Sequence, residues 1–176
     1  MKFCIDPGHN CPPKDTGAVG YLNEEKVAAE VSKLLKDELI ARGHQAILTH
    51  ATDGNSVTTS LSERCCQSND YEPDLFVSVH CNACQTTQLP MGSEVFIGSS
   101  KTTAVATRVC SSLEGLGFKN RGVKDGDRLF VLKYTDAPAI LIELFFIDSQ
   151  YDVNRYKRLG AAKLAKAIAE ALANAD

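Results

Sequence analysis

Short apolar runs alternate along the chain with longer segments in which apolar residues recur at helical spacing. Each run has roughly the length of a strand and is bounded by glycine, proline or polar residues, as buried strands usually are. The pattern predicts strands over residues 1–5, 45–49, 75–79, 93–97, 129–132 and 139–142.

The longer segments predict amphipathic helices. Val27, Val31 and Leu39 share one helical face between about residues 24 and 42, and Gly43 follows as a C-terminal cap. Strands that alternate with helices indicate an α/β fold. We expect a single domain over residues 1–176, with a mostly parallel, twisted sheet of about six strands flanked by helices on both faces. Further helices are expected over residues 61–68, 101–116 and 155–173.

The composition is that of an ordinary globular protein, with 44% hydrophobic and 23% charged residues. A chain of 176 residues suits one domain. The formal net charge of −3 argues against a nucleic-acid partner, because phosphate binding needs an excess of lysine and arginine. The chain has no apolar run of about 18 residues, so no membrane span is expected.

Seven cysteines cannot all pair internally, which argues against a secreted, disulfide-built scaffold. Cys81 and Cys84 form a C-x-x-C pair, but no second pair completes a four-cysteine zinc site. We therefore expect reduced, mostly buried cysteines that act as small apolar residues. The first residues show neither a long apolar segment nor a cleavage site, so we expect synthesis in the cytoplasm without a signal peptide.

Titratable residues stand at the ends of three predicted strands: His9, His80 and Glu143. Ligands of open α/β sheets bind beyond the carboxyl ends of the strands, so these residues are expected to converge. Glu24, at the start of the first long helix, can reach the same place. Two histidines and one glutamate are a ligand set of catalytic zinc, and a separate carboxylate must then take a proton from water.

Each of these residues also has a structural explanation. A histidine after a strand is often a hydrogen-bonded loop residue. Glu24 suits the positive end of a helix dipole. Glu143 is harder to explain in this way, because an unpaired carboxylate within an apolar run costs several kcal/mol. The spacing of His9, Glu24 and His80 forms no local signature, so residue types alone leave both explanations open.

Four short motifs help to decide between these explanations. They are Asp6-Pro7-Gly8-His9, Leu22-Asn23-Glu24, Ser78-Val79-His80-Cys81-Asn82-Ala83 and Ile140-Leu141-Ile142-Glu143. In their order and approximate spacing these motifs resemble the zinc-dependent N-acetylmuramoyl-L-alanine amidases of the amidase 3 type. Residues 118–124 and 128–132 are similar to the substrate-side region of clostridial-phage endolysins. The resemblance covers nearly the whole chain.

The resemblance implies that His9, Glu24 and His80 bind zinc and that Glu143 is the catalytic glutamate. Glu24 is favoured over Glu25 because it directly follows the leucine and asparagine of its motif. The two side chains point about 100° apart on a helix, so only one of them is expected to face the metal.

The resemblance also implies the reaction. It is hydrolysis of the amide between N-acetylmuramic acid and the L-alanine of the peptidoglycan stem peptide, by zinc-activated water with Glu143 as general base and acid. Asn82 and Arg121 are candidates for contacts to carbonyl or carboxylate groups of the substrate, although each also suits an ordinary turn or surface position. Another zinc peptidase or amidase, and a catalytically inactive peptidoglycan-binding domain, stay open as alternatives.

Peptidoglycan is therefore the expected partner, and the expected place of action is the cell wall, after release or export. The wall is often anionic and this chain is slightly negative, so electrostatic attraction would not hold it there. A separate wall-binding module or a holin is the kind of partner that would compensate.

Overall fold

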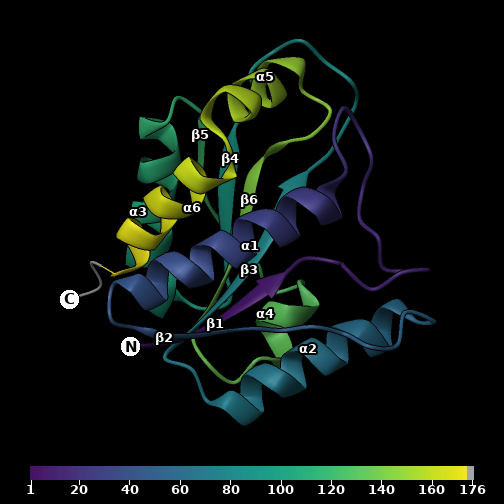
Figure 1. The fold of residues 1–176 in the computed structure, drawn as a ribbon, viewed down its shortest axis with the longest axis vertical. Helices are drawn as coiled ribbons and strands as arrows, with labels where there is room; N and C mark the ends of the chain where they lie inside the picture. The colour runs from purple at the N-terminus through teal and green to yellow at the C-terminus, as the bar shows by residue number, and fades with distance from the viewer. Residues whose placement is uncertain (174–176) are drawn as a thin grey trace.

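Six strands form one sheet, shown in Figure 1. They are β1 (Lys2–Pro7), β2 (Gln45–Leu48), β3 (Leu75–Asn82), β4 (Ser93–Ile97), β5 (Asn120–Asp125) and β6 (Ala139–Phe146). The computed structural model describes residues 1–173, and the strand order is β2-β1-β3-β6-β4-β5. Strands β2, β1, β3 and β6 are parallel, whereas β4 is antiparallel to β6 and parallel to β5.

Helices cover both faces of this sheet (Figure 1). One face packs against α1 (Glu24–Ala41), α3 (Thr103–Gly115), α5 (Gln150–Leu159) and α6 (Ala161–Ala173), and it holds the larger apolar cluster. The other face packs against α2 (Val57–Tyr71) and the short α4 (Phe130–Tyr134). A 3-10 turn, η1 (Ser100–Thr102), leads into α3.

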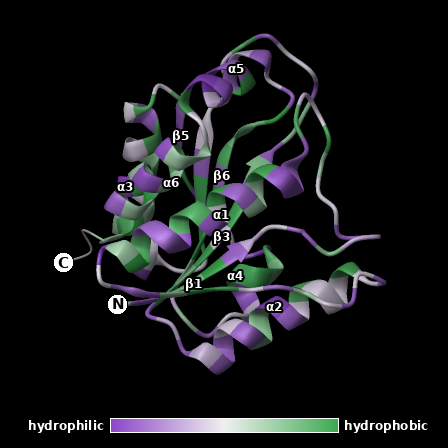
Figure 2. Ribbon diagram, in the orientation of Figure 1, coloured by the Kyte–Doolittle hydropathy of each residue, from purple (hydrophilic) through white to green (hydrophobic). Residues whose placement is uncertain are grey.

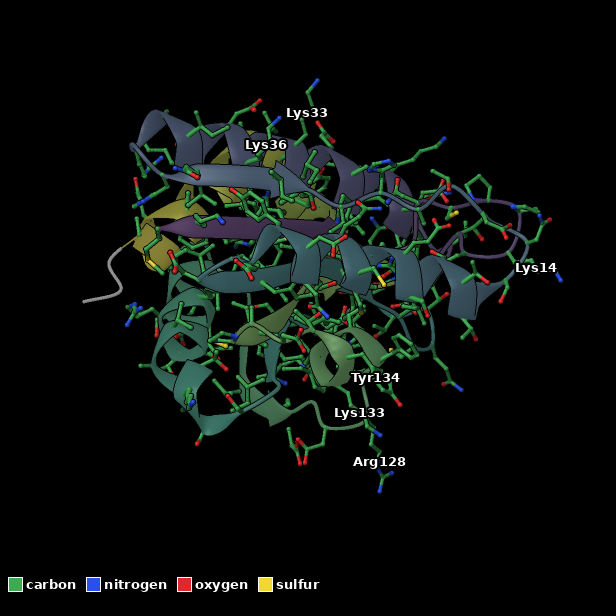
Figure 3. All side chains as sticks on the ribbon, turned by 90° about the horizontal axis from the view of Figure 1, so that it is seen from below. Lys14, Lys33, Lys36, Arg128, Lys133 and Tyr134 are labelled. Carbon is green, nitrogen blue, oxygen red and sulfur yellow. The ribbon has the colours of Figure 1, made fainter. Side chains whose placement is uncertain are left out.

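Alternation along the strands divides the core between the two faces, because successive side chains of a strand point in opposite directions. In β1, Phe3 and Ile5 belong to the α1 side and Cys4 belongs to the α2 side. Figure 2 shows largely hydrophobic central strands and helices that alternate between hydrophilic and hydrophobic residues. In Figure 3, Lys33 on α1 and Lys133 on α4 point outward from opposite sides of the sheet.

The predicted α/β class is confirmed, with its mostly parallel sheet and helices on both faces. The first long helix begins at Glu24 as expected, because the side chain of Asn23 caps it by accepting a hydrogen bond from the backbone N–H of Lys26 at 3.3 Å. Gly43 follows the helix with φ of 83°, the left-handed conformation that suits glycine at this position. No helix within residues 1–173 is long and apolar enough to cross a membrane.

One predicted strand is wrong. Residues 129–132 do not form a strand, since Phe130–Tyr134 is the helix α4. A short apolar run cannot be assigned to strand or helix by periodicity alone. The remaining strand of the sheet is instead β5, a polar segment without hydrophobic alternation. Among the strands of residues 1–173 it is the last in the sheet and pairs only with β4.

Two predicted helices also differ in extent. The segment 155–173 contains parts of two helices, because the chain turns at Gly160 with φ of 78°. Helix α2 starts at Val57 rather than near residue 61, since Ser56 caps it by accepting a hydrogen bond from the backbone N–H of Thr59. The first turn of α2 is mostly polar, so the spacing of apolar residues did not reveal where the helix begins.

Candidate metal centre

The sheet topology brings titratable side chains together at the carboxyl ends of the parallel strands. The carboxyl ends of β1, β3 and β6 meet there, and β4 begins there because it runs the opposite way. His80 of β3 is the register partner of Glu143 of β6, and Glu143 is also the partner of Glu94 of β4. The prediction that His80 and Glu143 follow their strands is wrong, since both strands extend beyond them.

His9, Glu24 and His80 form a compact cluster whose candidate ligand atoms all lie within 4.8 Å of one another. Glu24 Oε1 is 3.3 Å from His9 Nε2 and 3.0 Å from His80 Nδ1. The two imidazole rings meet edge to face, with centroids 4.9 Å apart. The neighbouring Glu25 does not belong to this cluster. The structure thus brings together the three residues proposed from the sequence as ligands.

Glu24 is held by backbone as well as by the histidines. Its Oε2 accepts a hydrogen bond from the N–H of Ala18 at 2.8 Å, and its Oε1 accepts one from the N–H of Cys81 at 3.2 Å. Burial raises the pKa of Glu24, but hydrogen bonds from His80, His9 and Ala18 outweigh burial and hold the pKa well below its usual range. Glu24 is therefore an ionised carboxylate at the cluster.

Two glycines allow the backbone to approach this cluster closely. Gly17 has φ of 69°, and a Cβ there would lie 2.8 Å from both Glu24 Oε2 and His9 Cδ2. A Cβ on Gly8 would lie 2.5 Å from His80 Cε1. A side chain at either position would displace a member of the cluster.

The donor set fits a catalytic zinc ion, which takes three protein ligands and keeps one position open. With bonds of about 2.0–2.1 Å, neighbouring ligand atoms of a tetrahedral site stand about 3.4 Å apart. The 3.3 Å between His9 Nε2 and Glu24 Oε1 is close to this separation. The side chains of His9 and His80 are 27% and 14% exposed, so solvent can reach the cluster.

Glu143 lies beside the cluster with one oxygen unpartnered. Its Oε2 is buried and has no hydrogen-bond partner among residues 1–173. Burial raises its pKa to about 7; the charges of Glu24 and Glu94 add to this effect, and His80 opposes it. A carboxyl group whose pKa lies near neutrality can both accept and donate a proton.

Asn82 and Arg121 both donate hydrogen bonds to the carboxylate of Glu94, a residue that was not predicted from the sequence. Glu94 Oε1 accepts a hydrogen bond from Asn82 Nδ2 at 2.7 Å, and Glu94 Oε2 accepts one from Arg121 Nε at 2.9 Å. The guanidinium of Arg121 also lies over the ring of Phe146, 4.9 Å from its centroid. A glutamate inside the predicted apolar strand 93–97 was the signal that could have identified Glu94.

A buried charged network lies behind His9. Asp15 Oδ1 is 2.7 Å from His9 Nδ1, and Asp15 Oδ2 accepts hydrogen bonds from Ser60 Oγ and Arg64 Nη2. Arg64 Nη1 donates to both carboxylate oxygens of Asp6, at 2.9 and 3.0 Å. Sequence reasoning missed Asp15 and Arg64, although a charged arginine on a helix that must cover the sheet was an available signal.

The cysteines are free, and five of the seven are buried, in agreement with the prediction of mostly buried cysteines. Cys81 is buried, and burial raises the pKa of its thiol, which disfavours the thiolate needed for metal binding. Cys84 is exposed. Neither cysteine belongs to the cluster of His9, Glu24 and His80.

Comparisons with known proteins cover nearly the whole chain. The model of a family described as N-acetylmuramoyl-L-alanine amidase, Amidase_3, matches residues 3–174. The N-acetylmuramoyl-L-alanine amidase LytC of Bacillus subtilis (strain 168) is 32% identical over 160 residues, which are 88% of this chain and 31% of LytC. The endolysin of Bacillus phage SPP1 is 32% identical over 165 residues, which are 88% of this chain and 58% of the endolysin.

A solved structure described as the catalytic domain of the CD27L endolysin targeting Clostridia difficile superposes with a TM-score of 0.90 at 32% identity. The match covers 99% of this chain and 97% of that one. By contrast, the chain spans only between 31% and 51% of the length of the first curated relatives it matches. The similarity thus corresponds to a part of these longer relatives.

Proposed function

This chain belongs to the N-acetylmuramoyl-L-alanine amidase family of the amidase 3 type, and from that membership we propose that it hydrolyses the amide between N-acetylmuramic acid and L-alanine in peptidoglycan. In this proposal residues 1–176 are an amidase catalytic domain. Hydrolysis of an amide requires a polarised carbonyl, an activated water and a proton for the leaving nitrogen.

The observation that carries the proposal is the arrangement of four side chains at one sheet edge. His9, Glu24 and His80 offer ligand atoms within 4.8 Å of one another. Glu143 is paired with His80 on the neighbouring strand, and its Oε2 has no hydrogen-bond partner in the described part of the chain, residues 1–173. Metal-assisted amide hydrolysis needs a set of metal ligands and a nearby group that can transfer a proton. The three-residue cluster and the carboxyl group of Glu143, with its raised pKa, provide this combination.

We assign zinc to the centre, with His9, Glu24 and His80 as its ligands. Two neutral imidazoles and one carboxylate are typical donors of catalytic zinc. When bound, zinc lowers the pKa of its water and polarises the substrate carbonyl. The lack of a side chain at Gly8 and Gly17 leaves the space that His9, Glu24 and His80 occupy.

Glu143 moves the proton in this mechanism. Its Oε2 accepts a proton from the attacking water and then passes it to the amide nitrogen, so that the amine of L-alanine can leave. A raised pKa suits both halves of this transfer, because the carboxyl group binds the proton and releases it without a large free-energy difference.

Asn82 and Arg121 are proposed to contact the substrate. Arg121 Nε donates a hydrogen bond to Glu94 Oε2. The side chain of Arg121 is still partly exposed, and its guanidinium lies over the ring of Phe146. A planar guanidinium suits a carboxylate of the stem peptide. The amide of Asn82 lies on the same edge and suits a peptide carbonyl or N–H.

Peptidoglycan is accordingly the proposed substrate and the cell wall the proposed place of action, after synthesis in the cytoplasm and release or export. A separate wall-binding module or a holin remains the proposed kind of partner. The curated relatives are longer than this chain, which is compatible with further modules in proteins of this family.

Product analysis on purified peptidoglycan tests the reaction. We expect new amino groups of L-alanine and no new reducing sugar ends, with zinc present in the purified protein. Reducing ends without new amino groups would indicate a glycosidase, and cleavage at another peptide bond would indicate a different zinc peptidase. Binding to peptidoglycan without any cleavage would indicate an inactive binding domain.

A further inference from the structure

The two ring nitrogens of His9 face different groups. Nε2 points to Glu24 Oε1 in the cluster, whereas Nδ1 is 2.7 Å from Asp15 Oδ1. A carboxylate can only accept a hydrogen bond, so the proton of this contact belongs to His9 Nδ1. Neutral His9 in this arrangement keeps the lone pair of Nε2 free for a metal ion.

Asp15 is itself held in place by two donors. Ser60 Oγ donates to Asp15 Oδ2 at 2.6 Å, and Arg64 Nη2 donates to the same oxygen at 3.3 Å. Asp15 is only 3% exposed, so water does not compete for these contacts. Burial raises the pKa of Asp15, but Ser60, His9 and Arg64 outweigh it and lower the pKa, which keeps the carboxylate ionised.

Arg64 connects this contact to the strands that carry the histidines. It is 1% exposed, and its Nη1 bonds both oxygens of Asp6 in β1. Asp6 also accepts a hydrogen bond from Ser78 Oγ, at 2.6 Å, and Ser78 is its register partner in β3. Asp6 precedes His9 by a short turn and Ser78 lies two positions before His80. Arg64 of α2 thus holds Asp6 in β1, and Asp6 in turn links β1 to β3 through Ser78.

We propose that Asp15 is a positioning residue that fixes the tautomer and orientation of His9, and that Arg64 supports it by bridging Asp15 and Asp6. The inference rests on the proposed function where it takes the cluster to be a zinc site. Partners that bind the second nitrogen of a metal-ligating histidine typically change metal affinity about 10- to 100-fold when removed.

Two measurements on Asp15→Ala test this role. Long-range proton–nitrogen NMR of the metal-free protein, at a pH that leaves His9 neutral, assigns the ring proton to Nδ1 or Nε2. We expect Nδ1 in the wild type and a shift toward Nε2 in the variant. Competition with a chromogenic chelator should show zinc binding weakened by about 10- to 100-fold.

Asp15→Asn is the conservative variant, because its amide oxygen still accepts the hydrogen bond from His9 Nδ1. We expect it to retain the Nδ1 tautomer and to lose less zinc affinity than Asp15→Ala does. If Asp15→Ala does not fold, Asp15→Asn carries the test, since loss of the negative charge should still weaken zinc binding measurably.

Asp152→Asn is the matched control. Asp152 is also a buried carboxylate, but it accepts hydrogen bonds from the backbone of Gly92 and Phe146, and within residues 1–173 no hydrogen bond or ion pair joins it to a histidine. It should lower stability and leave the tautomer of His9 and the zinc affinity unchanged. An equal loss of zinc affinity in Asp152→Asn and Asp15→Ala would overturn the proposal, because the effect would then be general destabilisation.

The outcomes separate this inference from the proposed function. An unchanged His9 tautomer and unchanged zinc affinity in Asp15→Ala would refute the positioning role, even if the wild type cleaves peptidoglycan. A shifted tautomer in a protein whose wild type cleaves no peptidoglycan would support the positioning role and contradict the proposed reaction.

Discussion

Glu143 and Glu94 lie directly opposite each other on the neighbouring antiparallel strands β6 and β4. Like charges in such a pair destabilise a sheet. The two residues avoid this through different surroundings: Glu94 accepts hydrogen bonds from Asn82 and Arg121, whereas burial raises the pKa of Glu143 to about 7. Glu94 is thus held by two hydrogen-bond donors, and the pKa of Glu143 lies near neutrality.

Glu94→Gln tests whether Glu94 positions Asn82 and Arg121. Asn82 and Arg121 donate to different oxygens of Glu94, and in glutamine one of these oxygens is replaced by an NH2 group, which cannot accept a hydrogen bond. A lost hydrogen bond to a charged group costs about 1.5–3 kcal/mol, which corresponds to a rise in KM of about 10-fold or more. Steady-state kinetics on a soluble muramoyl peptide measure this. An unchanged KM with a large loss of kcat would contradict a positioning role for Glu94.

Glu143→Gln should lower kcat by about 100- to 10,000-fold, because the amide cannot take up a proton. Zinc content should stay at the wild-type level, since Glu143 is not among the proposed ligands. Turnover and elemental analysis on the same preparation check both points. Substantial activity in this variant would remove Glu143 from the mechanism.

His9→Ala, His80→Ala and Glu24→Gln should each lose zinc and activity together, because three protein ligands are the usual minimum of a catalytic zinc site. Glu25→Gln is the matched control for Glu24→Gln and should retain both. Treatment of the wild type with a chelator should abolish activity, and added zinc should restore it. Normal zinc content in all three ligand variants would exclude the proposed set.

Gly17→Ala should weaken zinc binding as well as stability. The left-handed backbone costs an alanine roughly 1–2 kcal/mol, and the added Cβ would also press on Glu24 and His9. Gly43→Ala carries the same kind of backbone cost, with φ of 83° and nothing within 4 Å of the added Cβ. Both variants should lose stability in urea unfolding, but only Gly17→Ala should lose zinc affinity.

Arg64→Gln should lower the free energy of unfolding by about 3–5 kcal/mol, because it leaves the buried carboxylates of Asp6 and Asp15 without their cation. Arg42→Gln makes the same change in an ion pair near the surface, with Glu38 and Glu170, and should cost at most about 1 kcal/mol. Urea unfolding of the two variants compares the costs. Equal losses of unfolding free energy in the two variants would contradict a stabilising role for the buried ion pairs of Arg64.

Local patterns in the sequence determined the α/β class, most elements, and the residues proposed for the centre. Periodicity predicted α1 and its start at Glu24, because such signals depend on neighbouring residues. The ends of predicted strands suggested His9 and His80 as candidates, although β3 extends past His80 to Asn82. The polar edge strand β5 carried no such signal. The apolar run 129–132 carried an ambiguous one, and its assignment as a strand was wrong.

Only the tertiary structure decided which partners support the centre. Arg64 meets Asp6 and Asp15 across 58 and 49 positions of the sequence, and Glu94 meets Arg121 across 27. These contacts depend on strand order, on the reversed direction of β4 and on how α2 lies on the sheet. A single sequence shows which side chains can carry a charge. Which of them are buried and which are paired follows from packing, and burial and pairing set the pKa and the partners of each group.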